Sequence, residues 1–278
     1  MKHIRSIEEL ARWKSEGREK KLGFVPTMGA LHEGHLSLVQ LSQEKCDRTL
    51  VSIYVNPTQF NNKEDFAKYP NTLEADLSAL EAMGCDAVFL PDAEMLYPEG
   101  LKSRRFDFEG LDRHMEGAGR PGHFEGMATV VKRFFALIEP DIAVFGEKDY
   151  QQLSIIRHVV AKENWPVEIV PGPISREADG LAMSSRNMRL LPHERKESAQ
   201  IYAVLSRAIS TLDLEKTTRK TFEKACIKAL DAVPSIRVEY VSCCDAATLQ
   251  PLDEFNTSRP ARVFAAVQCG KVRLIDNL

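Results

Sequence analysis

Two histidines and two glycines lie within eight residues near the N-terminus, in the stretch MGALHEGH at residues 28–35. The apolar run LGFVPT precedes this stretch, and the helical pattern HLSLVQL overlaps its end. Glycines let the backbone approach a ligand closely, and a helix N-terminus offers free N–H groups and a partial positive charge. Two imidazoles beside such a terminus can donate hydrogen bonds to phosphate oxygens as charge develops in a transition state. The pattern therefore favours a phosphate site where a strand ends and a helix begins.

Three better-known motifs do not fit this stretch. A dinucleotide-binding fingerprint needs GxGxxG, whereas residues 29–34 read GALHEG. The spacing of these two glycines matches the start of a P-loop, but His35 and Leu36 stand where a P-loop carries its Lys and its Ser or Thr. A zinc-protease helix needs HExxH, whereas residues 32–35 read HEGH. Taken alone, two surface histidines in a polar turn remain an alternative.

The composition is that of an ordinary soluble globular protein. The 278 residues carry a formal net charge of −3, with 44% hydrophobic and 28% charged residues. This balance argues against a broad basic surface, so we predict no nucleic-acid partner. No apolar run approaches the roughly 20 residues of a membrane helix, and the charged N-terminus lacks the apolar segment of a secretory signal. We therefore predict a cytoplasmic chain with no membrane partner, reduced cysteines and no zinc site.

Short apolar runs alternate with amphipathic ones through most of the chain. The expected strands cover residues 22–27, 49–55, 85–92, 141–146 and 167–172, and the expected helices cover 35–46, 71–84, 126–140 and 150–163. Such alternation is typical of an α/β fold with a Rossmann-like, doubly wound parallel sheet. In the second helix, Asn71 and Glu74 predict a capping box, and Gly84 predicts the C-terminal end.

The pattern changes near residue 175. Two helical runs, at 191–212 and 222–233, are followed by three strand-like runs, at 236–244, 261–270 and 272–278. Helices followed by a series of strands indicate a smaller α+β domain. We therefore predict a Rossmann-like domain over residues 1–175 and a smaller C-terminal α+β domain over residues 176–278.

Motifs along the chain resemble one known family. His32-x-Gly34-His35 is similar to the HxGH signature of the nucleotidyltransferase superfamily, which follows the first strand and holds ATP phosphates. The other blocks are PTMGALHEGH, VNPTQF, YPNTLEADL, EGAGRPGHFEG, VFGEKDYQQL and DGLAMSSRN. Together they resemble the pantoate–β-alanine ligase (pantothenate synthetase) family over about residues 22–190, and RLIDN near the C-terminus continues the match more weakly.

The resemblance implies an ATP-dependent ligase that condenses pantoate with β-alanine to pantothenate. In such enzymes the pantoate carboxylate attacks the α-phosphorus of ATP, which gives pantoyl adenylate and pyrophosphate. The β-alanine amine then attacks the adenylate and releases AMP. The resemblance also implies Mg²⁺ with ATP, a homodimer, binding of nucleotide and pantoate by the first domain, and a lid-like C-terminal domain.

The resemblance also implies the site residues. The catalytic candidates are His35, His32 and Lys148, with His35 matching the family's catalytic histidine. The ATP-binding candidates are Met28, Gly29, Ala30, Leu31, His32, Glu33, Gly34, His35, Gly146, Glu147, Lys148, Asp149, Ser175, Met183, Ser184, Ser185 and Arg186. The substrate candidates are Gln59 and Gln152, matching the pantoate ligands of the family, and the metal candidate is Asp76.

Further contacts follow from the same resemblance. Met28 and Phe60 are expected to form an apolar wall for pantoate, and Asn56 to contact a hydroxyl or ribose. Arg120 and His123 are expected to face the substrate without being catalytic. For the polar segments GEKD and MSSRN, a solvated turn and a flexible linker remain the alternatives.

Other functions of the same fold are less consistent with the sequence. A nucleotidyltransferase acting on a phosphorylated acceptor would need more basic residues than NPTQF and DYQQL provide. A non-catalytic nucleotide sensor would be expected to lose a histidine or the lysine, whereas His32, His35, Lys148 and Arg186 are all present. A tRNA ligase would need an anticodon-binding module and a basic surface, and the tail of about 100 residues offers neither.

Overall fold

The structure is a computed structural model that describes residues 1–61, 63–255 and 259–278. The chain forms two compact units. Unit 1 consists of Met1–Glu109, Arg120–Glu147 and Gln152–Pro173, and unit 2 consists of Gly110–Gly119, Lys148–Gln151 and Ile174–Leu278. Unit 2 therefore includes two short segments from the part of the chain before residue 175. The domain boundary at residue 175 stays a prediction.

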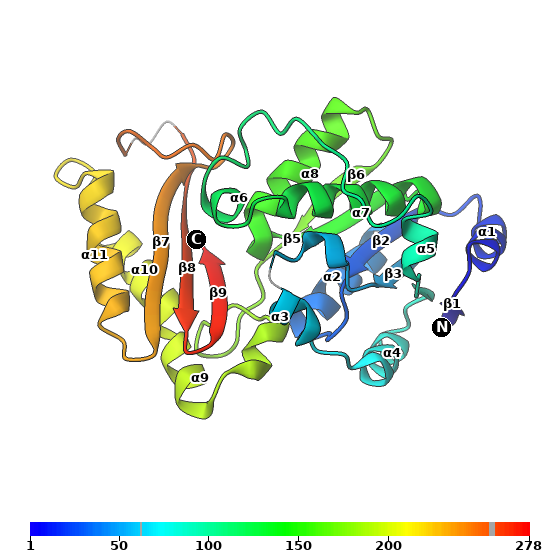
Figure 1. Ribbon diagram of the computed structural model, residues 1–278, viewed down its shortest axis with the longest axis horizontal. Coiled ribbons are helices and arrows are strands. Elements are labelled where there is room, and N and C mark those ends of the chain that lie inside the picture. The colour runs from blue at the N-terminus through cyan, green and yellow to red at the C-terminus, as the bar shows by residue number, and fades with distance from the viewer. Residues whose placement is uncertain (62, 256–258) are drawn as a thin grey trace. The chain divides into compact units, whose positions relative to one another are not determined.

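Unit 1 contains a six-stranded parallel sheet of order β1-β4-β3-β2-β5-β6 (Figure 1). Its strands are β1 (Lys2–Ile4), β2 (Leu22–Thr27), β3 (Arg48–Ile53), β4 (Ala87–Phe89), β5 (Ile142–Gly146) and β6 (Glu168–Gly172). From β2 the chain builds the sheet toward β3 and β4, and later toward β5 and β6 on the other side. Ligands of such sheets bind at the carboxyl ends of the strands beside this reversal. The predicted doubly wound sheet is confirmed.

The helices of unit 1 connect these parallel strands. They are α1 (Ile7–Ser15), α2 (Glu33–Lys45), α3 (Lys63–Ala67), α4 (Leu73–Ala82), α5 (Ala93–Leu96), α7 (His123–Ile138) and α8 (Tyr150–Lys162), whose first two residues belong to unit 2. Strand β1 was not predicted, because only Ile4 of its three residues is buried. Helix α1 was missed as well, since charged residues surround its few buried positions, Leu10 and Trp13. None of the helices described is long and apolar enough to span a membrane.

The central strand β2 is apolar on both faces. Phe24 packs against α7, with its ring 5.4 Å from that of Phe134 and 6.4 Å from that of Phe135. The next residue, Val25, is in a separate cluster with Val39 of α2. Successive side chains of a strand point to opposite faces, so helices on both faces require a continuous apolar run. This requirement explains the run LGFVPT.

Helix α2 approaches the sheet so closely that two strand positions leave no room for a side chain. A Cβ at Gly23 would lie 2.1 Å from Ser42 Oγ, and a Cβ at Gly172 would lie 2.1 Å from Leu38 Cδ2. The glycines therefore let α2 pack directly on β2 and β6. The position of the helix determines where its N-terminus, and hence the HEGH stretch, lies on the sheet.

Helix α4 starts later than its sequence pattern suggested. Thr72 is the N-cap residue, and no side-chain hydrogen bond caps the helix. The Thr72 hydroxyl donates instead to Asp76 Oδ1 at 3.0 Å. The predicted capping box of Asn71 and Glu74 is therefore wrong. The end of the helix was predicted correctly, because Gly84 follows it with a φ of +69°.

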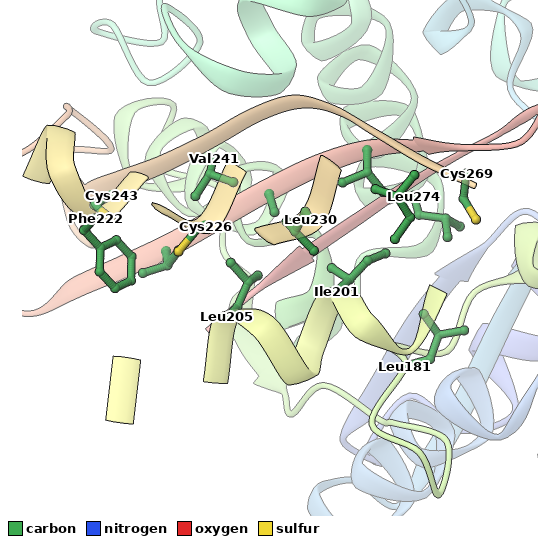
Figure 2. Close-up of a cluster of buried hydrophobic side chains, with 14 of the residues drawn as sticks. Leu181, Ile201, Leu205, Phe222, Cys226, Leu230, Val241, Cys243, Cys269 and Leu274 are labelled. Atoms are coloured by element: carbon green, nitrogen blue, oxygen red, sulfur yellow. The ribbon is translucent and has the colours of Figure 1, made fainter. Parts of the chain in front are cut away.

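Unit 2 contains a three-stranded antiparallel sheet of order β7-β8-β9. Its elements are α6 (Met115–Gly119), α9 (Pro192–Ser198), α10 (Gln200–Ser210), α11 (Arg219–Asp231), β7 (Ile236–Asp245), β8 (Ala261–Cys269) and β9 (Val272–Asn277). Leu205 of α10 and Phe222 of α11 share the buried cluster with Val241 of β7 (Figure 2). The predicted smaller α+β part is confirmed, but the helix expected over residues 191–212 is divided into α9 and α10 at Ala199.

All six cysteines are free. Five of them are buried, and Cys46 is half-buried. Burial raises the pKa of the Cys85 and Cys226 thiols to about 11. These thiols are therefore protonated and poorly nucleophilic near neutral pH.

Gly126 of α7 provides a test of the packing. A Cβ at this position would lie 2.2 Å from the carbonyl oxygen of Thr58, in the 3₁₀ helix η1 (Pro57–Gln59). Because backbone atoms cannot rotate out of the way, Gly126→Ala should destabilise the protein by about 1–3 kcal/mol in urea unfolding. The control is Gly119→Ala, since a Cβ at Gly119 meets no atom within 4 Å. Gly119→Ala should change the free energy of unfolding by less than about 0.5 kcal/mol. Equal losses of stability in both variants would contradict this account of the packing.

Candidate functional site

The turn after β2 is held by one buried carboxylate. Gly29 and Ala30 have positive φ angles of +78° and +50°. The N–H of Ala30 donates to Asp76 Oδ2 at 2.9 Å, and the N–H of Leu31 donates to Asp76 Oδ1 at 2.8 Å. Asp76 is only 3% exposed. Charge-assisted hydrogen bonds of this kind offset the conformational cost of the turn, and Asp76 thereby fixes the turn from which α2 begins.

The two histidines of HEGH cap helix α2. Nδ1 of His32 accepts a hydrogen bond from the N–H of Gly34 at 3.2 Å, and Nδ1 of His35 accepts one from the N–H of His32 at 3.4 Å. The two ring centroids are 4.0 Å apart. Because both Nδ1 atoms accept, the proton of each neutral ring is on Nε2. The N-terminus of α2 thus carries two imidazole Nε2–H donors, a combination suited to phosphate oxygens.

Asn56 orients Gln59, the first pantoate candidate. Nδ2 of Asn56 donates to Gln59 Oε1 at 3.1 Å and to the Gly126 carbonyl at 3.2 Å, and its Oδ1 accepts from the Tyr97 hydroxyl at 2.6 Å. Nε2 of Gln59 is 3.0 Å from Met28 Sδ. Asn56 is 1% exposed and supports Gln59, and its expected contact with a hydroxyl or ribose stays a prediction.

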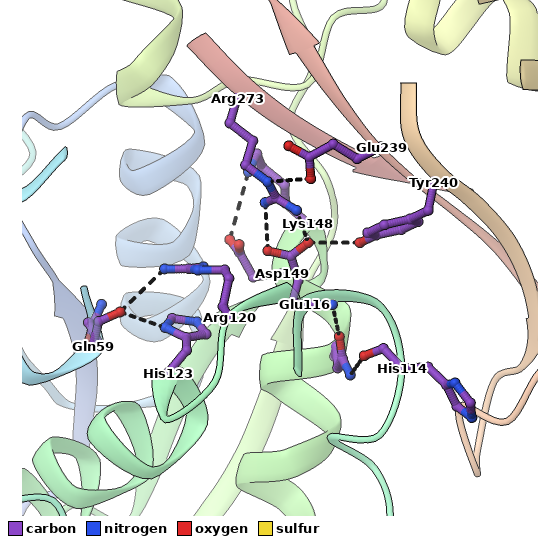
Figure 3. A network of polar contacts seen from close by, with 11 residues as sticks. Gln59, His114, Glu116, Arg120, His123, Lys148, Asp149, Glu239, Tyr240 and Arg273 are labelled. Atoms are coloured by element: carbon purple, nitrogen blue, oxygen red, sulfur yellow. Dashed lines mark hydrogen bonds and ion pairs between the residues drawn. The ribbon is translucent and has the colours of Figure 1, made fainter. Parts of the chain in front are cut away.

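Arg120 and His123 hold the backbone beside this glutamine (Figure 3). The carbonyl oxygen of Gln59 accepts from Nδ1 of His123 at 2.8 Å and from Nη2 of Arg120 at 3.3 Å. The expected orientation of Arg120 and His123 toward the substrate stays a prediction. Phe60, the next residue, packs against the rings of Phe66 and Tyr69 at 5.3 and 5.8 Å.

The GEKD segment begins where β5 ends. Gly146 and Glu147 belong to unit 1, and Lys148 and Asp149 belong to unit 2. Residues Glu147–Asp149 form the 3₁₀ helix η2. Nζ of Lys148 is 3.9 Å from Asp149 Oδ2, and the two side chains are 20% and 49% exposed. This long, partly solvated ion pair holds Lys148 only weakly, so its ammonium can exchange this partner for a phosphate.

The MSSRN segment follows a short hairpin in unit 2. Arg176 and Ala182 form a β-bridge, and the N–H of Met183 donates to the carbonyl of Ser175 at 3.0 Å. Ser184 is the N-cap of the 3₁₀ helix η3 (Ser185–Arg189), with its Oγ accepting from the N–H of Arg186. Ser185 is 6% exposed. The segment is therefore hydrogen-bonded structure, which argues against the alternative of a polar linker.

The two adjacent glutamines of α8 lie in different units. Gln152, the second pantoate candidate, belongs to unit 1 and is half-buried. Gln151 belongs to unit 2, is 4% exposed, and donates from Nε2 to the carbonyls of Leu111 and His114 at 2.8 and 3.0 Å. Its Oε1 accepts from the N–H of Glu116 at 3.0 Å. This supporting role of Gln151 was not predicted, although Gln151 directly precedes the predicted residue Gln152.

Unit 2 also contains a buried carboxylate, Glu116, that was not predicted as a supporting residue. Glu116 of α6 is 7% exposed, and its oxygens accept from Nη1 and Nη2 of Arg273 at 2.7 and 2.8 Å (Figure 3). The hydroxyl of Tyr240 donates to Glu116 Oε1 at 2.8 Å. Burial, and then the Glu116 carboxylate, raises the pKa of Tyr240 well above its usual range, so the hydroxyl stays protonated. No local pattern connects residues this far apart in sequence.

The structure places limits on metal binding. Among residues 1–61, 63–255 and 259–278, no three or more His, Cys, Asp or Glu side chains form a group that could hold a metal ion. Asp76 Oδ1 accepts from the N–H of Leu31 and from the Thr72 hydroxyl, whereas Oδ2 accepts from the N–H of Ala30 and keeps a further lone pair. Mg²⁺ that accompanies a nucleotide takes most of its ligands from phosphates and water, so one carboxylate is sufficient. The donor set therefore fits, and Asp76 as the metal contact stays a prediction.

Comparisons with known proteins match one family over almost the whole chain. The sequence model of a family described as pantoate-beta-alanine ligase matches residues 2–278. The pantothenate synthetase of Bacteroides fragilis (strain YCH46) is 46% identical over 284 residues, covering 100% of this chain and 98% of that relative. The pantothenate synthetase of Heliobacterium modesticaldum is 43% identical over 280 residues, covering 100% and 99%.

Solved structures are similar as well. The crystal structure of pantothenate synthetase from Thermus thermophilus has a TM-score of 0.90 and 41% identity, covering 100% of this chain and 99% of that one. The crystal structure of pantoate-beta-alanine ligase from Francisella tularensis, complexed with beta-gamma ATP and beta-alanine, has a TM-score of 0.82 and 33% identity, covering 100% and 97%.

The role of Asp76 in the turn can be separated from metal binding. Asp76→Asn keeps the side-chain volume but turns one acceptor into a donor that faces a backbone N–H. In metal-free buffer with a chelator, this change should destabilise the protein by about 1–3 kcal/mol in urea unfolding. Asp92→Asn is the control, because Asp92 accepts from the N–H of Met95 as the N-cap of α5 and Asn caps almost equally well. A residue that only bound metal would show no such loss without metal.

Proposed function

This chain belongs to the pantoate-beta-alanine ligase family, and on this premise we propose how its residues condense pantoate with β-alanine. The family predicted from the motifs is confirmed by the match over residues 2–278 and by relatives that cover the whole chain. The observation that carries the mechanism is the HEGH turn, in which two Nε2–H donors accompany the N-terminus of α2 after β2. Binding of beta-gamma ATP and beta-alanine by the related ligase of Francisella tularensis supports the same substrates here.

The first step is the attack of the pantoate carboxylate on the α-phosphorus of ATP. A bond forms between a carboxylate oxygen and phosphorus, and the bond from phosphorus to the bridging oxygen breaks, so that pyrophosphate leaves. His32 and His35 donate hydrogen bonds from Nε2 to the phosphate oxygens as their charge increases. Donors held in place before the reaction stabilise this transition state without further reorganisation.

The family resemblance also assigns two cations of unit 2 to the nucleotide. Lys148 acts as a compact point charge, and Arg186 offers a planar fork of donors. Ser184 and Ser185 add hydroxyls and backbone N–H groups beside Arg186. The remaining nucleotide contacts of the GEKD and MSSRN regions are proposed to be Gly146, Glu147, Asp149, Ser175 and Met183.

Neutral amides are assigned to pantoate. Gln59, oriented by Asn56 and Met28, and Gln152 can bind the hydroxyls and carboxylate of pantoate without competing as nucleophiles. In the second step the β-alanine amine attacks the acyl carbon, the acyl–oxygen bond breaks, and AMP leaves. An amide bond forms, and the amine gives up one proton.

Four further assignments complete the proposal. Mg²⁺ would screen the charge of the triphosphate, with Asp76 as the protein's candidate contact. A homodimer is proposed from the family, and a cytoplasmic location is proposed from the composition and the free cysteines. A lid-like role is proposed for the C-terminal part of the chain.

The products distinguish adenylation from phosphorylation. With ATP, Mg²⁺, pantoate and β-alanine, the protein should release AMP and pyrophosphate, because HEGH lacks the lysine of a P-loop. Without β-alanine, labelled pyrophosphate should exchange into ATP only when pantoate is present. Chromatography of the nucleotides measures the first result and label transfer the second. Formation of ADP, or exchange that does not need pantoate, would exclude the proposed first step.

Single substitutions separate the two kinds of residue. His35→Ala and Lys148→Ala should lower kcat of the exchange reaction by about 10² or more, as expected for loss of a preorganised donor. Gln59→Ala and Gln152→Ala should act mainly on KM for pantoate, because these amides bind substrate before and during the reaction. His193→Ala, an exposed histidine of α9, serves as the control with kcat near that of the parent. A His35→Ala enzyme with parental kcat would exclude the proposed role of HEGH.

A further inference from the structure

Two consecutive polar residues end the last strand of unit 2. Asp276 and Asn277 of β9 are 4% and 2% exposed. Burial of a carboxylate and an amide is costly unless both are fully bonded. In β9 the two side chains point to opposite faces of the sheet. Their strand partners agree with this, since Asp276 pairs with Ala265 and Asn277 with Phe264.

Asp276 holds the hairpin that leads to MSSRN. Its Oδ2 accepts from Nη1 of Arg176 at 2.7 Å, and its Oδ1 accepts from Nη2 at 2.9 Å. Nη1 of Arg176 also donates to the carbonyl of Gly180 at 3.0 Å, and the guanidinium lies over the ring of Tyr202 at 4.1 Å. Arg176 thus joins β9 to both sides of the hairpin. The bidentate geometry fixes the direction as well as the distance.

Asn277 holds the backbone of the candidate catalytic lysine. Its Nδ2 donates to the carbonyl oxygen of Lys148 at 2.8 Å. Its Oδ1 accepts from Nη1 of Arg262, whose guanidinium lies over the ring of Tyr150 at 4.0 Å. The hydroxyl of Tyr150 donates to the carbonyl of Ala246 at 3.2 Å. Asn277 and its neighbours therefore fix the chain from Lys148 to Tyr150 within unit 2.

We propose that Asp276 and Asn277 are positioning residues for adenylation. Through Arg176, Asp276 sets the position of the hairpin that carries Ser184–Arg186. Through the Lys148 carbonyl, Asn277 sets the position of the lysine that binds phosphate. The end of β9, with its two side chains on opposite faces of the sheet, thereby fixes two proposed phosphate-binding segments of unit 2. These segments are Ser184–Arg186 and Lys148. This inference rests on the proposed function, because it assigns a role in the attack on ATP.

Near-isosteric substitutions test each contact separately. Asn277→Asp keeps the acceptor for Arg262 but places a carboxylate oxygen against the Lys148 carbonyl. It should lower kcat of pantoate-dependent pyrophosphate exchange by about tenfold or more, with KM for pantoate unchanged. Asp276→Asn loses the charge that pairs with Arg176 and should raise KM for ATP by about tenfold. If Asp276→Asn does not fold, Arg176→Lys, which keeps the charge but loses the fork, should raise the same KM.

Coupling to Lys148 distinguishes positioning from general stability. If Asn277 acts through Lys148, adding Asn277→Asp to Lys148→Ala should lower kcat by less than about twofold. Asp245→Asn is the matched control, because Asp245 is 9% exposed at the end of β7 and caps a turn through the N–H groups of Ala247 and Thr248. Because Asn retains the Oδ1 that accepts from both N–H groups, this control should leave the melting temperature, kcat and both KM values near those of the parent.

Three results would overturn the inference. They are full additivity of Asn277→Asp with Lys148→Ala, unchanged kinetics in the Asn277 and Asp276 variants, and losses of activity that match only the folded fraction of each variant. Failure of the proposed function would look different, because the parent enzyme itself would then show no exchange.

Discussion

The hydrogen bonds from the turn after β2 to the Asp76 carboxylate are the constraint on which the candidate site depends. The turn contains Ala30 with a φ of +50°, a conformation that is costly for any residue other than glycine. Two charge-assisted hydrogen bonds from consecutive N–H groups offset this cost. With the turn fixed, His32 is placed to cap α2, and the capping contacts then direct both imidazole Nε2 atoms. The orientation of the HEGH imidazoles therefore depends on a carboxylate more than 40 residues away in sequence.

The same arrangement recurs at the other candidate segments. Asn56, Gln151 and Asn277 are each at most 4% exposed, and each uses its side-chain amide to bond another segment of the chain. Because buried amides lose their hydration, they are stable only with full hydrogen bonding. Such residues restrict the groups beside them, so the reorganisation needed during catalysis is small. These three amides thus fix the segments that they bond.

Lys148 shows why sequence position is a poor guide to structural context. It lies two residues after the end of β5 in unit 1, yet Lys148–Gln151 belong to unit 2. Within unit 2, Asn277 bonds the Lys148 carbonyl, and Gln151 bonds the segment containing Leu111 and His114. A boundary drawn from composition near residue 175 does not include such short insertions, because four residues carry too little pattern to be assigned.

The order of the main strands and helices and the family could both be predicted from the sequence, because hydrophobic periodicity and motifs are local properties. The prediction failed at Asn71, since capping there is decided by the bond from Thr72 to Asp76 rather than by residue type. The pairing of Arg176 with Asp276 and of Glu116 with Arg273, across 100 and 157 residues, came from the folded chain alone. The reason is physical: a polar side chain can bond many partners, and burial selects the one that folding brings within hydrogen-bond distance.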